Sequence, residues 1–376
     1  MDRRTPESSL ASRVRLSERL DEVKERLAES VTDEFLTRHA DWVARYGARA
    51  REFGIQDARY HIDFLRGAVE AGSVEAFGQY AAWAAGVLAA RGILPHYLVE
   101  NLEQIEEALR TALTEEQHSA ILPILAEGKK EASLVGSKKT VAEVQELTNS
   151  VYLQAILRGD RVAAGGVMEE ALHSGADAVD IYLELFQSAL FEVGRLWETG
   201  QISVATEHMA TAVTQVLMAR LYTRLPRREA SQGNAVITGV QGELHQIGAN
   251  MVADILDAHG WNVLFLGTNA PHEGIIEAAA SHRAKLVGIS ATMLSNVPRV
   301  RQLLGGLRKR VPGVRVVVGG GAFRAVPTLW RDLGADGFAP DLRATIDLVN
   351  TLLPPERPAK RTARKRAQPK PKPGST

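Results

Sequence analysis

The sequence contains no cysteine, no excess of charge of either sign and no long apolar run. Without cysteine, the 376-residue chain can form neither a disulfide nor a thioether bond to a cofactor, and its composition fits a reducing cytoplasm. Its 45 basic residues balance its 45 acidic residues, so the whole-chain charge points to neither nucleic acid nor a membrane as a partner. No apolar run approaches the roughly 18 residues that span a bilayer, and residues 1–20 are too polar for a signal peptide. We therefore expect a soluble, cytoplasmic chain of two or three domains.

Helical periodicity, strand-like runs and composition divide the chain into segments. The last segment is rich in lysine, arginine and proline, so it cannot build a core and is expected to be disordered. It could serve only solubility, or it could contact nucleic acid or an acidic partner. The segments are a flexible N-terminus (1–15), a helical domain (16–127), a linker (128–140), a helical cap (141–227), a domain of alternating strands and helices (232–353) and the basic tail (354–376).

A short apolar run at residues 235–240 ends in a polar loop that contains a histidine. The run predicts a buried strand, and residues 249–259 predict the helix that follows the loop. In that position His245 projects into the crevice where open parallel sheets bind ligands. Glu243 can hold the far ring nitrogen of His245, as the partners of metal-bound histidines do, and Gly248 lets a bulky group approach the backbone. The alternative is an ordinary loop histidine.

Strands and helices alternate from residue 232 to residue 353, which predicts a Rossmann-like, doubly wound parallel sheet. Ser290 and Thr292 follow the third predicted strand, and Gly319 and Gly320 follow the fourth. Hydroxyl groups and a backbone without side chains are what a buried nucleotide tail needs. No G-x-G-x-x-G motif opens the first helix, which disfavours a nicotinamide dinucleotide site.

These three elements, in this order, resemble the D-x-H-x-x-G, Ser-x-Leu/Thr and Gly-Gly motifs of cobalamin-binding domains. In that family the histidine is the lower ligand of cobalt. The resemblance implies that His245 binds cobalt from below and that Glu243 stands where the family usually has aspartate. It also implies a cobalamin site that includes Gly248 and the hydroxyl and glycine positions after the third and fourth strands.

The cap at residues 141–227 predicts four helices and resembles the four-helix bundle that precedes cobalamin domains. Trp197 is followed, after nine residues, by Glu207 and His208. This spacing resembles that of the adenosylcobalamin photoreceptors, the light-dependent repressors of carotenoid genes, in which these residues enclose the upper adenosyl group. The resemblance implies that all three contact the adenosyl group of adenosylcobalamin here. Those repressors carry a ligating histidine directly after the tryptophan, where this chain has Glu198, so their bis-histidine state after photolysis is not implied.

In the helical domain, one predicted helix carries Asp57, Tyr60, His61 and Phe64 at i, i+3, i+4 and i+7, so they share a face. Polar groups on an apolar face need partners, which could be protein groups or a ligand. The many aromatic residues of this domain could equally form a large core.

The sequence Asp57-x-x-Tyr60-His61 resembles the Asp-x-x-Tyr-Tyr motif of the phycobiliproteins, which have a globin-like fold and bind a linear tetrapyrrole. Their attachment cysteine corresponds to Gly54 here, so the resemblance implies a bilin held noncovalently, such as biliverdin. Its propionates would need cations, for which Arg49, Arg51 and Arg59 are candidates. Without a bilin, the domain would be a globin-like sensor with a satisfied buried aspartate. The residues that we assign to the bilin are Asp57, Tyr60, His61, Arg59, Phe53 and Tyr80.

The order of a globin-like domain, a four-helix cap and a cobalamin domain resembles the photocobilins, photoreceptors that combine a bilin with adenosylcobalamin. This resemblance implies a light sensor, not an enzyme, in which Co–C photolysis rearranges domains or a homo-oligomer (a dimer or tetramer) and signals to an unknown partner. The main alternative is a corrinoid carrier for methyl transfer, which shares the sheet domain and the lower histidine. A cobalamin-free interaction protein on a degenerate fold is a further alternative.

Overall fold

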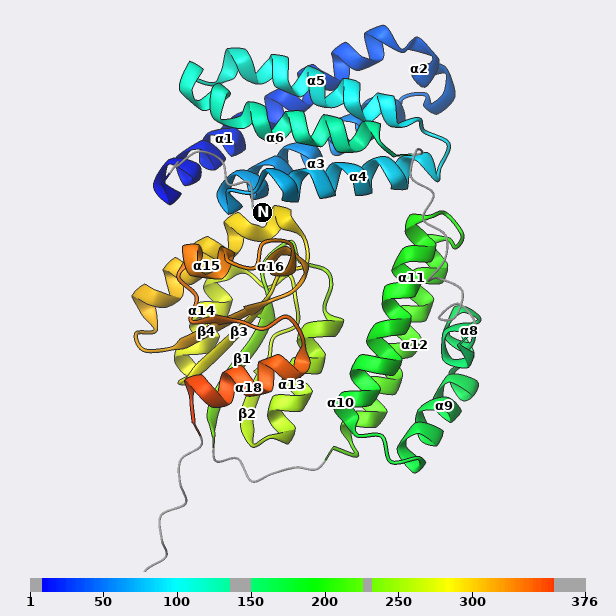
Figure 1. The fold of residues 1–376 in the computed structure, drawn as a ribbon, viewed down its shortest axis with the longest axis vertical. Helices are drawn as coiled ribbons and strands as arrows, with labels where there is room; N and C mark the ends of the chain where they lie inside the picture. Colours follow the sequence, from blue (N-terminus) through cyan, green and yellow to red (C-terminus); the bar gives the residue numbers. More distant parts are fainter. Residues whose placement is uncertain (1–8, 136–149, 226–231, 355–376) are drawn as a thin grey trace, which may run out of the picture.

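A computed structural model describes residues 9–135, 150–225 and 232–354 of the chain. These residues form a helical domain, a helical cap and a parallel-sheet domain, and Figure 1 shows the helical domain lying across the ends of the other two. In the part of the chain described, no helix is both long and apolar enough to cross a membrane.

The helical domain is built from helices with well-defined ends. Ser73 caps α4 by accepting from the Ala76 N–H, and Thr114 and Gln117 form a capping box at α6. Helix α1 packs along α3, and α4 packs along α6. This confirms an N-terminal helical domain, while the globin-like arrangement stays a prediction. The helices are α1 (Leu10–Arg38), α2 (Ala40–Tyr46), α3 (Arg49–Ala71), α4 (Val74–Ala89), α5 (Pro95–Ala112) and α6 (Glu115–Ser133).

Both predicted boundaries of this domain differ from the structure. Residues 10–15, which we expected to be flexible, form the first turns of α1, because the Ser9 side chain accepts from the Ser12 N–H and caps the helix. Residues 128–133, assigned to the linker, belong to α6. Residues 136–140 of the predicted linker, residues 141–149 of the predicted cap and the basic tail from residue 355 lie outside the described residues.

The cap has the predicted four-helix layout. Helices α10, η1 and α11 follow one another without a break, and η1 has the wider π-helical hydrogen-bonding pattern. Side chains of Ser150, Asp160 and Ser203 cap the starts of α8, α9 and α12. The elements are α8 (Val151–Leu157), α9 (Arg161–His173), α10 (Ala178–Asp180), η1 (Ile181–Gln187), α11 (Ser188–Glu198) and α12 (Val204–Tyr222).

The sheet domain has parallel strands in the order β2-β1-β3-β4-β5. Helices α13 and α18 pack together, as do α14 and α15, and each pair contributes to a different apolar cluster beside the sheet. The predicted doubly wound parallel sheet is therefore confirmed. The strands are β1 (Gly233–Gly239), β2 (Trp261–Phe265), β3 (Leu286–Ser290), β4 (Arg315–Gly319) and β5 (Gly337–Phe338). The helices are α13 (Ile247–Ala258), α14 (His272–Ser281), η2 (Leu294–Asn296), α15 (Val297–Arg310), α16 (Gly321–Ala325), α17 (Leu329–Leu333) and α18 (Leu342–Leu352).

Helix α3 sits directly on η2 of the sheet domain. A Cβ atom at Gly67 would lie 2.1 Å from the carbonyl oxygen of Leu294, so only glycine permits this approach. One turn further along α3, the fully buried Glu70 accepts from Arg301 of α15 at 2.9 Å. The two domains thus share a close contact and a buried ion pair.

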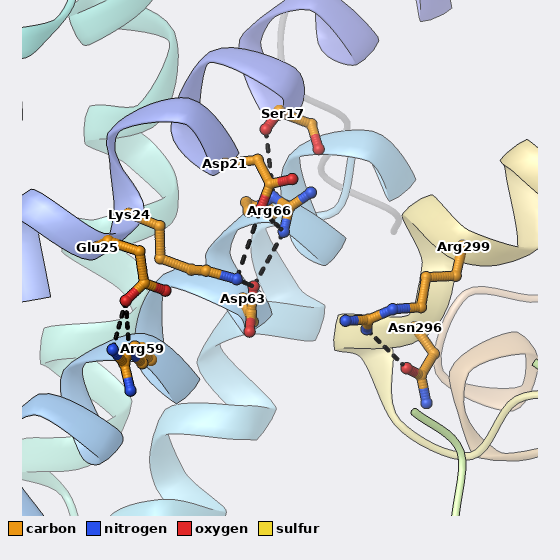
Figure 2. A network of polar contacts seen from close by, with 9 residues as sticks. All are labelled: Ser17, Asp21, Lys24, Glu25, Arg59, Asp63, Arg66, Asn296 and Arg299. Carbon is orange, nitrogen blue, oxygen red and sulfur yellow. Dashed lines mark hydrogen bonds and ion pairs between the residues drawn. The ribbon is translucent and has the colours of Figure 1, made fainter. Parts of the chain in front are cut away.

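A network of charged side chains ties α1 to α3 next to this contact (Figure 2). Arg66 bridges Asp21 of α1 at 2.6 Å and Asp63 of α3 at 3.0 Å. Lys24 of α1 also reaches Asp63, at 2.9 Å. These ion pairs therefore hold α1 against α3 beside the contact between α3 and the sheet domain.

Candidate functional site

A cavity of about 1080 Å³ opens at the carboxyl ends of the strands, where the sheet domain faces the cap and the helical domain. Its walls come from the loops after β1, β3 and β4, from α11 and α12 of the cap, and from α3 and α4 of the helical domain. Open parallel sheets bind their ligands at this edge. Leu244 and Phe191 in the walls are 75% and 60% exposed, which is apolar surface that a bound ligand would cover.

His245 stands in the loop between β1 and α13 and faces the cavity. Its Nδ1 donates to Oε1 of Glu243 at 2.6 Å, and its backbone N–H donates to the same oxygen at 2.9 Å. Burial alone would raise the pKa of the Glu243 carboxyl, but hydrogen bonds from His245 and from the Thr292 N–H lower it below its usual value. The same carboxylate raises the pKa of His245. The imidazole is thereby oriented with Nε2 left to bind a metal ion.

The second oxygen of Glu243 binds the loop after β3. It accepts from the Thr292 N–H at 2.6 Å and from Nδ2 of Asn296 at 3.1 Å. Asn296 is 2% exposed and closes η2, the element on which α3 rests. No local sequence pattern indicates Asn296, because its role depends on a contact with a residue 53 positions away.

The predicted nucleotide-tail positions come together in the cavity wall. Ser290, Thr292, Gly319 and Gly320 all line it. Gly320 has a φ of 102°, and a Cβ there would lie 2.4 Å from the carbonyl oxygen of Ala291, so the position requires glycine. These residues form a slot whose backbone a ligand can approach closely.

Gly248 also lines the cavity and has open space where a Cβ would be. A side chain at this position would project into the space beside His245. The absence of a side chain therefore leaves room for a broad ligand over the histidine.

On the opposite side, the cavity is lined by Trp197 at the end of α11 and by Glu207 and His208 in the first turns of α12. Glu207 accepts from Nδ1 of His208 and, through its other oxygen, from the Thr211 hydroxyl at 3.1 Å. It also raises the pKa of His245 from across the cavity, although less than Glu243 does. The predicted upper and lower groups therefore face one space.

The helical domain completes the cavity with Phe64, Tyr80 and Trp83. Tyr80 stacks on Phe64 with 3.7 Å between ring centroids, and its hydroxyl lies 2.6 Å from Nδ1 of the buried His61. Burial lowers the pKa of His61 to about 4, so this histidine is neutral at pH 7. Tyr80 was predicted as a bilin contact, whereas the wall positions of Phe64 and Trp83 were not.

The other residues predicted for the bilin lie outside this cavity. Phe53 and Tyr60 are 44% and 52% exposed on α3. Asp57 is exposed on α3, although partial desolvation by the surrounding protein raises the pKa of its carboxyl to about 6. It has no hydrogen bond or ion pair with any residue that the structure describes. Arg59 pairs with Glu25 of α1, with its Nε 2.8 Å from the carboxylate.

The site combines a supported imidazole, a slot lined by glycines and an aromatic wall. A single ligand can use all three features. A cobalamin needs an axial ligand below its cobalt, room for its nucleotide tail and a cover over its upper face. The residues present fit all three requirements, so the fold and the site define a cobalamin-binding protein.

Comparisons with known proteins agree with this class. Residues 233–346 match the family model described as "B12 binding domain", and residues 150–222 match a second model with the same description. Neither match extends into residues 1–149. The prediction of a cobalamin cofactor is confirmed at this level.

Similar curated proteins are corrinoid proteins. A corrinoid protein of Desulfitobacterium hafniense is 28% identical over 207 residues, which is 53% of this chain and 94% of that protein. Trimethylamine corrinoid protein 1 of Methanosarcina acetivorans is 28% identical over 208 residues, with the same shares of 53% and 94%. The solved monomethylamine corrinoid protein of Methanosarcina barkeri is 24% identical, with a TM-score of 0.48 over 54% of this chain and 98% of its own. The names of the two curated relatives match the corrinoid class of our alternative and mention neither light nor a bilin.

Proposed function

We propose that this chain is a cobalamin-dependent light sensor that binds adenosylcobalamin in the three-walled cavity. The observation that carries the proposal is that α3 and α4, as well as the cap, line the cavity. A carrier must expose the upper face of its corrin to a methyl donor. In this structure that side is walled by aromatic and acidic side chains, which suit a nucleoside better than a bare methyl group.

Adenosylcobalamin supplies a Co–C bond that light can break. His245 would hold the lower side of the cofactor, and Glu243 keeps the imidazole of His245 in place. Trp197, Glu207 and His208 line the cavity and would contact the upper group. Loss of that group removes a packing partner from all three side chains at once.

The signal is a change in how the cap docks on the sheet domain. Two tyrosine hydroxyls of the cap bind α13: Tyr182 donates to Asp254 at 2.7 Å and Tyr222 donates to Asp257 at 2.8 Å. These contacts are at the far end of the cap from Trp197, so they are suited to act as a hinge. The bound upper group shifts the docking equilibrium only by its different affinity for the two arrangements. A homo-oligomer or a separate partner protein reads the new surface.

A noncovalent bilin on the helical domain, biliverdin being our candidate, would add sensitivity at longer wavelengths. Asp57 lies on α3 within one turn of the exposed Phe53 and Tyr60 and has no hydrogen-bond partner among the described residues, which supports it, because this carboxyl group is available for pyrrole N–H groups. The cation for a propionate is not Arg51 in the present arrangement, since Arg51 donates to both oxygens of Asp33.

A corrinoid carrier for methyl transfer is the second candidate, and the names of the relatives favour it. In that function the helical domain must swing away to admit a methyltransferase. The contacts of Gly67 and of the Glu70–Arg301 pair would then have to break in each cycle.

One experiment separates the candidates. The full chain is loaded with adenosylcobalamin and biliverdin in darkness, and its absorbance is recorded before and after illumination. Light cleaves adenosylcobalamin even when it is free, so the elution volume of the loaded chain in size-exclusion chromatography is compared in darkness and after illumination as well. A light-dependent change in elution volume together with changes in both sets of bands supports the sensor with a bilin, and the same change with the cobalamin bands alone removes the bilin. An unchanged elution volume, together with methylcobalamin bound at least as tightly as adenosylcobalamin, refutes the sensor in favour of the carrier.

A further inference from the structure

Trp83 of the helical domain and Glu198 of the cap form a hydrogen bond inside the cavity wall. Nε1 of Trp83 donates to Oε1 of Glu198 at 2.8 Å. Both side chains are partly buried and both line the cavity that His245 faces. The other carboxylate oxygen of Glu198 has no hydrogen-bond partner among the residues that the structure describes. A bound ligand can therefore reach an aromatic face and a hydrogen-bond acceptor at this point.

The position of this pair is fixed by contacts on either side of it. Arg91, in the turn that follows α4, places its guanidinium 4.9 Å from the ring centroid of Trp197. Gly200, which follows α11 with a φ of 70°, packs so closely that a Cβ would be 3.0 Å from the carbonyl oxygen of Ala90. The end of α4 is therefore seated on the turn between α11 and α12, and Trp83 is part of the wall.

We propose that Trp83 and Glu198 are part of the upper-ligand pocket and set its selectivity for a nucleoside over a methyl group. The proposal deepens the cobalamin site described above and rests on cobalamin binding there, but it does not require a response to light. It assigns to the N-terminal domain a direct part in choosing the form of the cofactor.

The chemistry of the two side chains supports this role. The indole face of Trp83 can stack on the purine of an adenosyl group, because every base presents a π-face. The unpaired oxygen of Glu198 can accept from a ribose hydroxyl or from an exocyclic amino group. A methyl group offers neither a π-face nor a donor, so both contacts favour the adenosyl form selectively.

The order of the two contacts also matters. Because the Trp83 N–H occupies one oxygen of Glu198, the carboxylate is turned toward a defined direction before any ligand enters. Preorganisation of this kind reduces the entropy lost on binding. Trp83 thus acts both as a contact and as a positioning residue for Glu198.

The test compares dissociation constants of adenosylcobalamin and methylcobalamin for the full chain, measured in darkness by absorbance titration. Trp83→Leu removes the ring and its N–H, and we expect it to lower the adenosyl-to-methyl selectivity by about 10-fold with methylcobalamin affinity nearly unchanged. Glu198→Gln keeps an acceptor oxygen for the Trp83 N–H but replaces the acceptor that faces the ligand by an amide NH2, which can only donate. It should lower the selectivity several-fold in the same direction.

Trp42→Leu is the matched control, because Trp42 is a partly buried tryptophan of the same domain that does not line the cavity. It should leave the selectivity at the wild-type value. If Trp83→Leu does not fold, as judged by circular dichroism, Glu198→Gln alone decides the outcome. Unchanged selectivity in a folded variant overturns the proposal while cobalamin binding stands. Failure of the wild-type chain to bind either cobalamin overturns the cobalamin site and this proposal together.

Discussion

Replacing Gly67 by alanine should destabilise the protein, although alanine is the better helix former. The added Cβ would lie 2.1 Å from the Leu294 carbonyl oxygen and 2.6 Å from its carbonyl carbon. Non-bonded carbon atoms rest at about 3.5–4 Å, so α3 and η2 must separate by roughly 1 Å. Overpacking of this kind costs about 1–3 kcal/mol, against a gain of about 0.5–1 kcal/mol for removing glycine from a helix. We expect a net loss of about 1–2 kcal/mol.

Gly86→Ala is the matched control in the same domain. Gly86 is inside α4, and no atom outside its own helix lies within 4 Å of a Cβ built there. This change should stabilise the chain by about 0.5–1 kcal/mol, so the two variants should differ by about 2 kcal/mol.

Urea denaturation of the cofactor-free chain measures both variants against the wild type. Cobalamin titration adds a second readout, because η2 contains Asn296, which supports Glu243. Gly67→Ala should therefore weaken cobalamin binding, and Gly86→Ala should not. A Gly67→Ala protein as stable as Gly86→Ala would show that α3 does not rest on η2 in solution.

Other perturbations test the site and its supports. His245→Ala should remove the axial imidazole from the cobalamin spectrum, and Glu243→Gln should weaken cobalamin binding about 10–100-fold; full affinity with an unchanged spectrum in His245→Ala would reject the lower-ligand assignment. Arg301→Met should cost about 3–5 kcal/mol in urea denaturation because it strands the fully buried Glu70, and adding Glu70→Gln should recover much of that loss; additive losses would contradict a coupled pair. Burial raises the pKa of Asp254 to about 6 from an ordinary value of 3.8, so the folded state binds its proton more tightly than the unfolded state. The resulting stability is present below about pH 4 and is lost as the pH rises through 6. Thermal melts of Asp254→Asn should show a flatter profile than the wild type over that range, and parallel profiles would reject this origin.

The sheet and the lower part of the site could be predicted because their signals are local. An apolar run predicts the strand, the histidine in the next loop predicts the ligand position, and the acid two residues before it predicts the support for the histidine. All three signals lie within a few positions, and the structure places Glu243 against His245. Ser290 is likewise the last residue of β3, and Gly320 comes directly after β4, so both positions could be predicted from the ends of the strands. Parallel topology then brings these separate strand ends to one edge of the sheet.

The contacts between domains could not be predicted, because they depend on how distant elements are placed. Trp83 and Glu198 are 115 positions apart, and neither residue has a local pattern that indicates the other. The helical face that we predicted on α3 illustrates the same limit. Periodicity groups Tyr60 with His61, but packing leaves Tyr60 exposed and buries His61 against α4. Sequence spacing predicts which residues share a face of the helix. The elements that pack against that face determine which of these residues become buried.

The contact between α3 and the sheet domain also constrains the order of events during synthesis. Glu70 and its partner Arg301 are 231 positions apart, so a ribosome adding roughly 5–20 residues per second makes them about 10–50 s apart. Through that interval the helical domain can fold, but the surface around Gly67 has no partner in its own chain. A finished neighbour on the same messenger carries the η2 surface that this face fits. Exchange of helical domains between copies is therefore an assembly error open to this chain, and slow translation across residues 71–293 would increase it.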